Sequence, residues 1–134
     1  MTDSMHPSMA VLTKLDLKNL DECQNIIAGD FVWHYFNPRL PELDGDHHGV
    51  KGLKSFFARL NTTSHASFEV NVIDGRPVGD ELAVTHVCNR MSLDGKSIEF
   101  DAVVVWRIVN GNIAEAWDIP AVNTVRTVEE GLAS

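Results

Sequence analysis

The sequence has few of the residues that would direct it to an oxidising compartment, a membrane or a nucleic acid. Its two cysteines, Cys23 and Cys88, match no metal-binding or redox spacing, and we expect both to be reduced core residues of a cytoplasmic protein. No apolar run approaches the roughly 18 residues of a membrane span, and residues 1–14 do not resemble a signal peptide. The net charge of −8 argues against partners such as nucleic acid or anionic membrane.

The motifs of common catalytic and cofactor sites are also absent. The sequence contains no Gly-x-Ser-x-Gly, no phosphate-binding loop, no dinucleotide fingerprint and no His-Glu-x-x-His. Asp44, Asp46, His47 and His48 stand close together within residues 37–49, but no other residues at zinc-ligand spacing accompany them. We therefore expect neither a metal site nor an organic cofactor, and we interpret this segment as an irregular loop.

The N-terminal half has helical periodicity in two places. Apolar residues recur at intervals of three and four over residues 16–28 and again over residues 50–60, which predicts two amphipathic helices. Between them, residues 31–36 (FVWHYF) are aromatic and β-branched and predict a strand. With 44% hydrophobic residues, the chain has enough apolar material for one domain with a core.

The C-terminal half changes to the two-residue period of β-strands from residue 66 onward. Asp94-Gly95 and Asn110-Gly111 separate alternating runs, and such pairs favour tight hairpins because both turn residues need a positive φ. A further turn is expected over residues 74–80. The pattern predicts an antiparallel meander of four strands, and therefore an α+β fold with N-terminal helices packed on a mostly antiparallel sheet; the resemblance described below implies that this sheet is curved.

One strand of this meander has an unusual composition. Residues 102–109 are apolar on nearly both faces, which predicts that helices cover one side and a second subunit covers the other. We therefore expect a homodimer. The polar tail over residues 121–134 is expected to be loose, and residues 1–8 are expected to be either a frayed tail or the lead-in to a helix.

Three stretches have the order and composition of a known family: GDFVWHY at 29–35, HGVKGLKSFF at 48–57 and VVVWRIVNGNIAEAWDIP at 103–120. Through them, residues 16–120 resemble the SnoaL-like branch of the nuclear transport factor 2-like superfamily, and residues 1–134 are expected to form a single such domain. The resemblance implies a cone-shaped roll in which the sheet encloses a pocket for a small apolar molecule. It does not define the function, because this fold hosts several classes of enzyme and also binding modules.

Asp118 is the leading candidate for a catalytic residue. It follows Trp117 in the last predicted strand and has apolar neighbours, and burial there would raise its pKa toward the range useful for proton transfer. By resemblance, the position matches the acid/base aspartate of SnoaL-type cyclases. The alternative is a structural aspartate that binds the backbone near the end of the strand.

The neighbouring residues Trp33, His34 and Tyr35 are further candidates on the first strand. Alternation places Trp33 and Tyr35 on one face and His34 on the other. The resemblance implies that the Trp33 and Tyr35 face points into the pocket, where Tyr35 offers a hydrogen-bond donor. His34 would act as the base if the register were shifted by one residue, and otherwise is a half-buried histidine bonded to the backbone.

Four more residues are expected to bind substrate in the pocket. Val104 and Trp106 belong to the apolar strand, and His86 and Asn89 belong to the strand before it. His86 and Asn89 lie on opposite faces of their strand, Asn89 together with Thr85, and the sequence leaves open which of the two faces lines the pocket.

The combination favours acid–base chemistry, such as that of an isomerase or cyclase, on an apolar carbonyl compound. The catalytic sets of related families do not carry over in full. Tyr35 is the only tyrosine and does not lie in the first helix, as it would in ketosteroid isomerases, and their second acid falls near Val104. The missing second acid favours the alternative, which is a non-catalytic ligand-binding or dimerisation module of the same fold.

Overall fold

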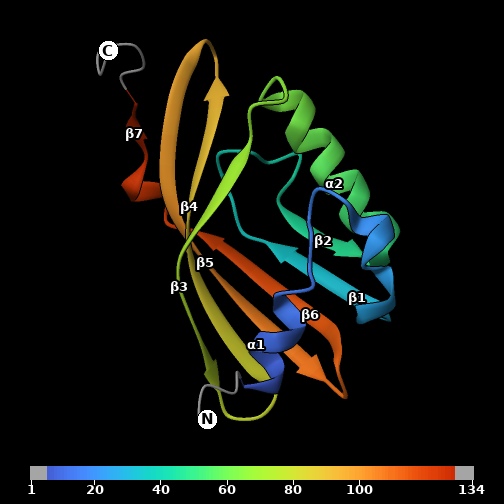
Figure 1. The fold of residues 1–134 in the computed structure, drawn as a ribbon. Coiled ribbons are helices and arrows are strands. Elements are labelled where there is room, and N and C mark those ends of the chain that lie inside the picture. The colour runs from blue at the N-terminus through green and yellow to red at the C-terminus, as the bar shows by residue number, and fades with distance from the viewer. Residues whose placement is uncertain (1–5, 129–134) are drawn as a thin grey trace.

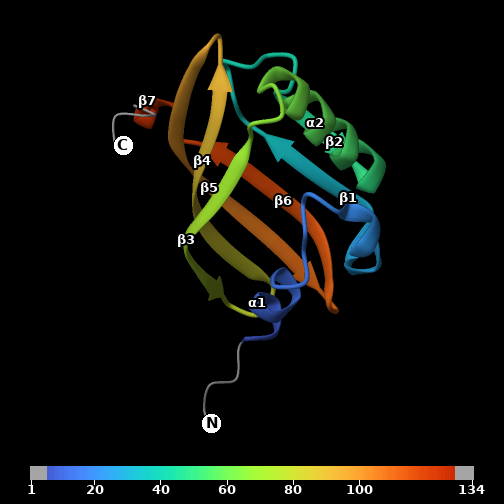
Figure 2. The same ribbon diagram turned by 45° about the horizontal axis from the view of Figure 1, so that its top comes forward.

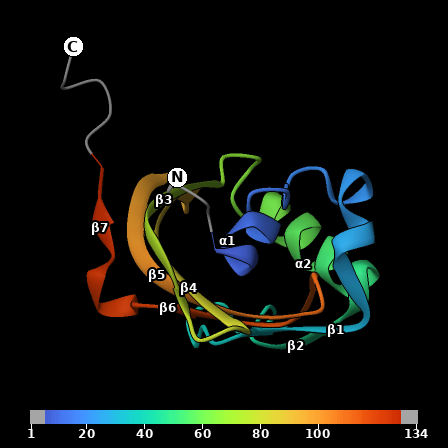
Figure 3. The ribbon, with the colours of Figure 1, turned by 60° about the horizontal axis from the view of Figure 1, so that its bottom comes forward.

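The computed structural model describes residues 6–128, which form a strongly curved sheet with helices on its concave side (Figure 1). Viewed from below, the strands trace an arc, and α1 and α2 lie inside it (Figure 3). The strands are β1 (Ile27–Tyr35), β2 (Gly45–His48), β3 (Glu69–Val78), β4 (Leu82–Leu93), β5 (Lys96–Val109), β6 (Asn112–Pro120) and β7 (Arg126–Thr127). The helices are α1 (Pro7–Leu12), α2 (Gly49–Thr63) and the 3-10 helices η1 (Leu20–Glu22), η2 (Gln24–Ile26) and η3 (Val122–Thr124).

The sheet has the strand order β2-β1-β6-β5-β4-β3, and β7 pairs with β5 (Figure 2). All neighbouring strands are antiparallel except β1 and β6, which run parallel. The predicted hairpin turns are confirmed, since φ is 52° at Asp94, 79° at Gly95, 53° at Asn110 and 79° at Gly111. The predicted α+β class with a mostly antiparallel sheet is therefore confirmed.

Helix α2 confirms the prediction for residues 50–60 and covers the inner face of β1. Its buried residues include Leu53, Phe56 and Leu60, which recur at helical spacing. The ring of Phe56 lies 5.8 Å from that of Trp33 and 4.8 Å from that of Tyr35, measured between centroids. This packing fixes the inner face of β1, from which the side chain of Trp33 reaches the core.

The helix predicted over residues 16–28 is wrong. The chain forms the two short 3-10 helices η1 and η2 instead, and β1 already begins at Ile27. Leu20, Cys23 and Ile26 are buried at intervals of three residues, which matches the three residues per turn of a 3-10 helix.

Helix α1 begins at Pro7, within the segment 1–8 that was expected to be a frayed tail or the lead-in to a helix. Pro7 occupies its first turn, where the missing N–H has no consequence. The N–H of Ser8 donates to Nδ1 of His6 at 3.1 Å, so a histidine side chain caps the helix. The expectation for residues 1–5 lies outside the described residues.

Three further boundaries differ from the prediction. The segment 37–49, expected to be an irregular loop, contains strand β2, and the tail expected over 121–134 contains η3 and β7, while residues 129–134 lie outside the described part. Strand β3 continues to Val78 through the turn predicted over 74–80. It includes Pro77 because β3 is an edge strand on which a missing N–H is tolerated.

The apolar run over residues 102–109 has one buried face and one partly exposed face. Ala102, Val104 and Trp106 point inward and are buried, whereas Val103 on the outer face is 38% exposed. Within residues 6–128 no helix covers this outer face (Figure 3), and the predicted second subunit stays a prediction. None of the described helices has the length and apolar character needed to cross a membrane.

Candidate functional site

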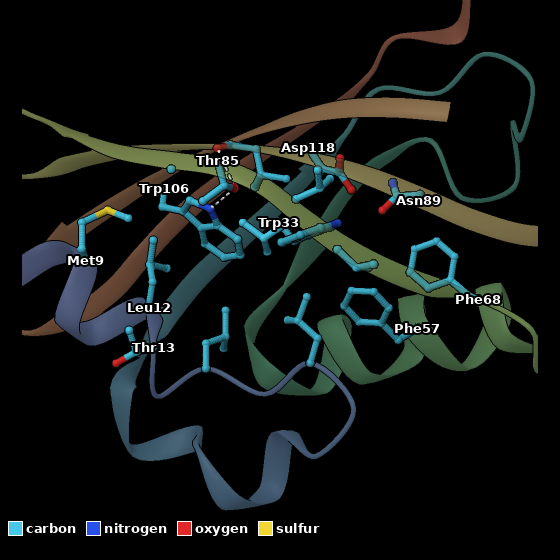
Figure 4. Close-up of a pocket in the computed structure, with 17 residues that line it drawn as sticks. Met9, Leu12, Thr13, Trp33, Phe57, Phe68, Thr85, Asn89, Trp106 and Asp118 are labelled. Carbon is cyan, nitrogen blue, oxygen red and sulfur yellow. Dashed lines mark hydrogen bonds between the residues drawn. The ribbon is translucent and has the colours of Figure 1, made fainter. Parts of the chain in front are cut away.

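A cavity of about 380 Å³ lies between the concave face of the sheet and the N-terminal segment (Figure 4). Its lining is predominantly apolar and comes from the N-terminal segment, α2 and all strands from β1 to β6 except β2. The lining residues are Met9, Leu12, Thr13, Leu15, Leu17, Trp33, Phe57, Phe68, Val70, Val72, Gly75, Thr85, Val87, Asn89, Val104, Trp106 and Asp118. This size and character suit a small organic ligand with one or two rings.

The N-terminal segment closes one side of the cavity, and the edge strand β3 borders another. Helix α1 approaches β3 so closely that a Cβ added to Gly75 would lie 3.1 Å from Cε of Met9. Glycine at this position therefore permits the contact. On β3, Val70 and Val72 line the cavity but are 38% and 67% exposed, so this wall also faces solvent.

Asp118 brings a carboxyl group into the cavity wall. It lies in β6 in register with Val104 of β5 and Tyr35 of β1, and it is only 8% exposed. Burial raises the pKa of Asp118 from 3.8 to about 7. Among the described residues, no group forms a hydrogen bond with its Oδ1. The carboxyl group is therefore available to a ligand and is close to half-ionised at neutral pH.

Two further polar atoms at the cavity are buried without a partner. These are Nε1 of Trp33 and Oδ1 of Asn89, for which the part of the chain described here offers no hydrogen bond. Trp106 differs, because its Nε1–H donates to Oγ1 of Thr85 at 3.0 Å. Since buried polar groups are normally paired, the unpaired donor and acceptors mark where a ligand would complete the hydrogen bonding.

Tyr35 points to the inner side of the sheet but is not among the cavity-lining residues. Its hydroxyl oxygen accepts a hydrogen bond from Nδ2 of Asn37 at 2.9 Å, and its ring packs against Phe56. Burial, together with the charges of Asp118 and Asp44, raises the pKa of Tyr35. The hydroxyl therefore stays protonated at neutral pH and lies behind the cavity wall, as a neighbour of Asp118.

His34 does not face the cavity, and the hypothesis that it serves as the base is wrong. Its Nδ1 lies 2.6 Å from Oδ1 of Asp46 and its Nε2 lies 2.5 Å from Oε2 of Glu115. The ring also stacks on Trp117 at 5.4 Å between centroids. Burial lowers the pKa of His34, but the hydrogen bonds and charges of Glu115 and Asp46 outweigh that effect and raise it. The strand register is the unshifted one, which places His34 on the outer face.

The choice between the two faces of β4 is also decided by the geometry. His86 lies on the outer face, 3.7 Å from Oδ1 of Asp101, and is absent from the cavity lining, so its expected role in binding substrate is wrong. Asn89 and Thr85 line the cavity together with Val104 and Trp106. The remaining expected binding residue, Trp33, lines it from β1.

Several lining residues were missed by the sequence reading. Met9, Leu12 and Leu15 come from a segment whose secondary structure was not predicted. Their apolar character was the signal that could have indicated burial of this segment. Within residues 6–128, no group of three His, Cys, Asp or Glu side chains is arranged to hold a metal ion. His47, one of the candidates in the loop, instead places Nε2 at 2.7 Å from the carbonyl oxygen of Leu43.

Known proteins share this architecture at low sequence identity. The crystal structure of TerC co-crystallized with polyporic acid matches with 17% identity and a TM-score of 0.74, covering 87% of this chain and 93% of that one. A nuclear transport factor 2-like protein of unknown function from Burkholderia pseudomallei K96243 matches with 21% identity and a TM-score of 0.76, covering 89% and 94%. A putative polyketide cyclase from Bacillus cereus ATCC 10987 matches with 18% identity and a TM-score of 0.64, covering 89% and 74%.

These structural matches establish the fold and nothing finer. No curated protein matches the sequence. The model of the SnoaL-like domain matches residues 10–116, which is most of the chain. The chain therefore belongs to the SnoaL-like domain family, with the nuclear transport factor 2-like fold.

Proposed function

We propose that this protein binds a small apolar carbonyl compound and catalyses proton transfer next to its carbonyl group, as an isomerase or cyclase. The observation that carries the proposal is Asp118, a buried carboxyl group in an apolar cavity whose Oδ1 has no hydrogen-bond partner within residues 6–128. A pKa of about 7 lets one group accept a proton and return it at neutral pH. The fold it shares with a putative polyketide cyclase and with TerC, which was crystallised with polyporic acid, supports a small organic ligand.

The chemistry follows from the position of the carboxylate. Ionised Asp118 removes a proton from the carbon next to the carbonyl, and the electron pair of that C–H bond forms the C=C bond of an enolate. The carbonyl π pair moves onto oxygen. In the return step the oxygen pair re-forms C=O and the C=C pair takes the proton from protonated Asp118 at the same carbon, or at the γ-carbon of a ligand in which a second C=C bond is conjugated with the enolate. The proton transfer as written requires no oxidant, metal or organic cofactor.

A direct test is deuterium exchange into β-tetralone, an apolar ring ketone with acidic C–H bonds next to its carbonyl. We expect the protein to accelerate exchange, as followed by proton NMR in deuterated buffer, and Asp118→Asn to abolish the acceleration. Asp80→Asn is the matched control, because Asp80 lies in an exposed turn after β3. Acceleration that survives in Asp118→Asn would refute the role of Asp118.

A non-catalytic binding module is the second candidate. Within the described part of the chain, residues 6–128, Asp118 is the only acid or base among the 17 residues that line the cavity, so the proposed chemistry rests on that one titratable group. Binding of β-tetralone without accelerated exchange, in wild type as well as in the variant, would favour this candidate.

The outer face of the sheet supports a homodimer as part of the same proposal. Val103 and Ile119 lie side by side in the β5–β6 register and are 38% and 45% exposed. Neighbouring exposed apolar residues favour burial against a second copy.

The two cysteines bear on the compartment. Cys23 and Cys88 are buried and form no disulfide, which supports the cytoplasm as the compartment.

A further inference from the structure

We propose that the indole N–H of Trp33 binds the carbonyl oxygen of the ligand, and that the ligand is therefore an apolar ring ketone, or its enol, with this oxygen directed toward β1. The inference rests on the proposed function and deepens it, because it assigns the group that receives the negative charge when Asp118 takes the proton. Tyr35 and His34 do not supply that group, since Tyr35 is not among the residues that line the cavity and His34 lies on the outer face.

Trp33 is a preorganised donor. Its side chain is 2% exposed, and its Nε1 has no acceptor within residues 6–128. The ring is held by Phe56, Phe57 and Trp106, whose ring centroids lie 5.8, 5.8 and 5.7 Å away. An N–H that is buried, unpaired and fixed in direction is unfavourable in the free protein, and an acceptor oxygen in the cavity relieves this.

The second indole of the cavity provides an internal comparison. Trp106 lines the same cavity, and its ring packs against that of Trp33. Its N–H, however, already donates to Thr85 at 3.0 Å. Only one of the two cavity indoles therefore offers a free donor, although both offer apolar ring surface.

The strand register places this donor near the proton-transfer group. Trp33 pairs with Ala116 and Tyr35 pairs with Asp118 across the parallel strands β1 and β6. Trp33 and Asp118 thus lie on adjacent strands, about 5 Å apart across the sheet and about 7 Å along it. In Figure 4 the indole nitrogen points toward the end of the cavity where Asp118 and Asn89 lie. A carbonyl oxygen at Trp33 leaves the neighbouring carbon within reach of Asp118.

The remaining lining restricts the ligand class further. None of the lining residues is Lys or Arg, so a ligand carboxylate or phosphate would meet the Asp118 carboxyl without a compensating cation. The unpaired Oδ1 of Asn89 accepts a hydrogen bond, which suits a hydroxyl group elsewhere on the ligand. The ring surfaces of Trp33 and Trp106 favour a flat, apolar skeleton.

The test compares two probes with the same naphthalene skeleton. β-Naphthol carries a hydroxyl group at the position where β-methylnaphthalene carries a methyl group. The first is a stable analogue of the enol of β-tetralone. Binding to wild type, Trp33→Phe and Trp106→Phe is measured by isothermal titration calorimetry. We expect Trp33→Phe to weaken β-naphthol about five- to tenfold more than β-methylnaphthalene. Trp106→Phe is expected to change both affinities by the same factor, because it removes ring surface but no free donor.

A spectroscopic measurement on the unaltered protein covers the case in which Trp33→Phe does not fold. The chain has 3 tryptophans, and the indole N–H signal of Trp33 is identified by elimination from spectra of Trp106→Phe and Trp117→Phe. We expect β-naphthol to move this signal downfield relative to β-methylnaphthalene, and the other two signals to respond equally to both probes.

The outcomes separate the two proposals. If both probes bind but Trp33→Phe and the Trp33 signal do not distinguish them, the assignment of Trp33 is refuted and the proposed pocket function stands. If neither probe binds the wild-type protein, the proposed function fails and the inference about Trp33 fails with it.

Discussion

The buried carboxyl group of Asp118 predicts a stability that decreases as the pH rises. In the unfolded chain the group has its ordinary pKa of 3.8, and in the folded protein burial raises this to about 7. The folded state therefore binds more protons between these two values, and the free energy of unfolding falls across this window. Moving one pKa by this amount corresponds to about 4 kcal/mol, which is a large share of the stability of a domain of this size.

Asp118→Asn isolates this contribution, because asparagine keeps the shape of the side chain and carries no charge. At pH 4 the folded carboxyl group is protonated, so the variant and the wild-type protein are expected to have similar free energies of unfolding. At pH 8 we expect the variant to be more stable by about 4 kcal/mol. Urea unfolding followed by tryptophan fluorescence at several pH values measures the difference, with Asp80→Asn as the exposed control.

The difference between the variant and the wild-type protein is the decisive quantity, because other groups also titrate in this range. A difference that stays constant from pH 4 to pH 8 would mean that Asp118 ionises normally in the folded protein. Its carboxylate would then be solvated or paired, and the argument for a poised proton-transfer group would fail.

Three further predictions concern other parts of the molecule. In His34→Gln we expect the stability that wild-type His34 gains from Asp46 and Glu115 to be lost. Because the pKa of His34 is raised above 6.5, that gain is complete below pH 6.5 and disappears as the pH rises through the folded pKa, so urea unfolding of the variant and wild type should converge at high pH. Asn89→Leu removes a buried, unpaired acceptor and should raise the free energy of unfolding by about 1 kcal/mol, as checked by thermal denaturation, and a clear loss would show that the amide is paired. Light scattering at micromolar concentration should give a dimer mass for wild type and a monomer mass for Val103→Glu, and a monomeric wild type would contradict the dimer.

The parts of the fold that the sequence predicts correctly depend on local signals. The hairpins follow from Asp94-Gly95 and Asn110-Gly111, because the positive φ values that these residues tolerate are required by the turn itself. Helix α2 follows from a strict apolar stripe. The resemblance to the family, read from three short stretches, adds the curvature of the sheet, which local periodicity does not contain.

The failures concern interactions between residues that are distant in sequence or unusual in type. Helix α1 is capped by His6, which is not one of the common capping residues, and it places the side chain of Met9 close to Gly75, which is distant in sequence. The helix expected over residues 16–28 failed because an apolar spacing of three fits a 3-10 helix as well as an α-helix.

The candidate site was predictable up to the choice of strand face and the hydrogen-bond partners. Alternation places Asp118, Trp33 and Trp106 on inward faces once the register is known. The hydrogen-bond partners are a different matter, since the hydroxyl oxygen of Tyr35 accepts a hydrogen bond from Asn37, only two residues away. No sequence pattern indicates that the N–H of Trp33 is unpaired while that of Trp106 is bound.

The exposure of β3 has a consequence for the evolution of ligand specificity in this protein. Its residues are exposed along the whole strand, yet Val70, Val72 and Gly75 form part of the cavity lining. Substitutions on a solvent-exposed edge strand usually change stability little. Substitutions on β3 can therefore alter ligand preference while Asp118 and the tryptophans are retained. A mutant library restricted to this strand is expected to yield variants with new ligand specificity.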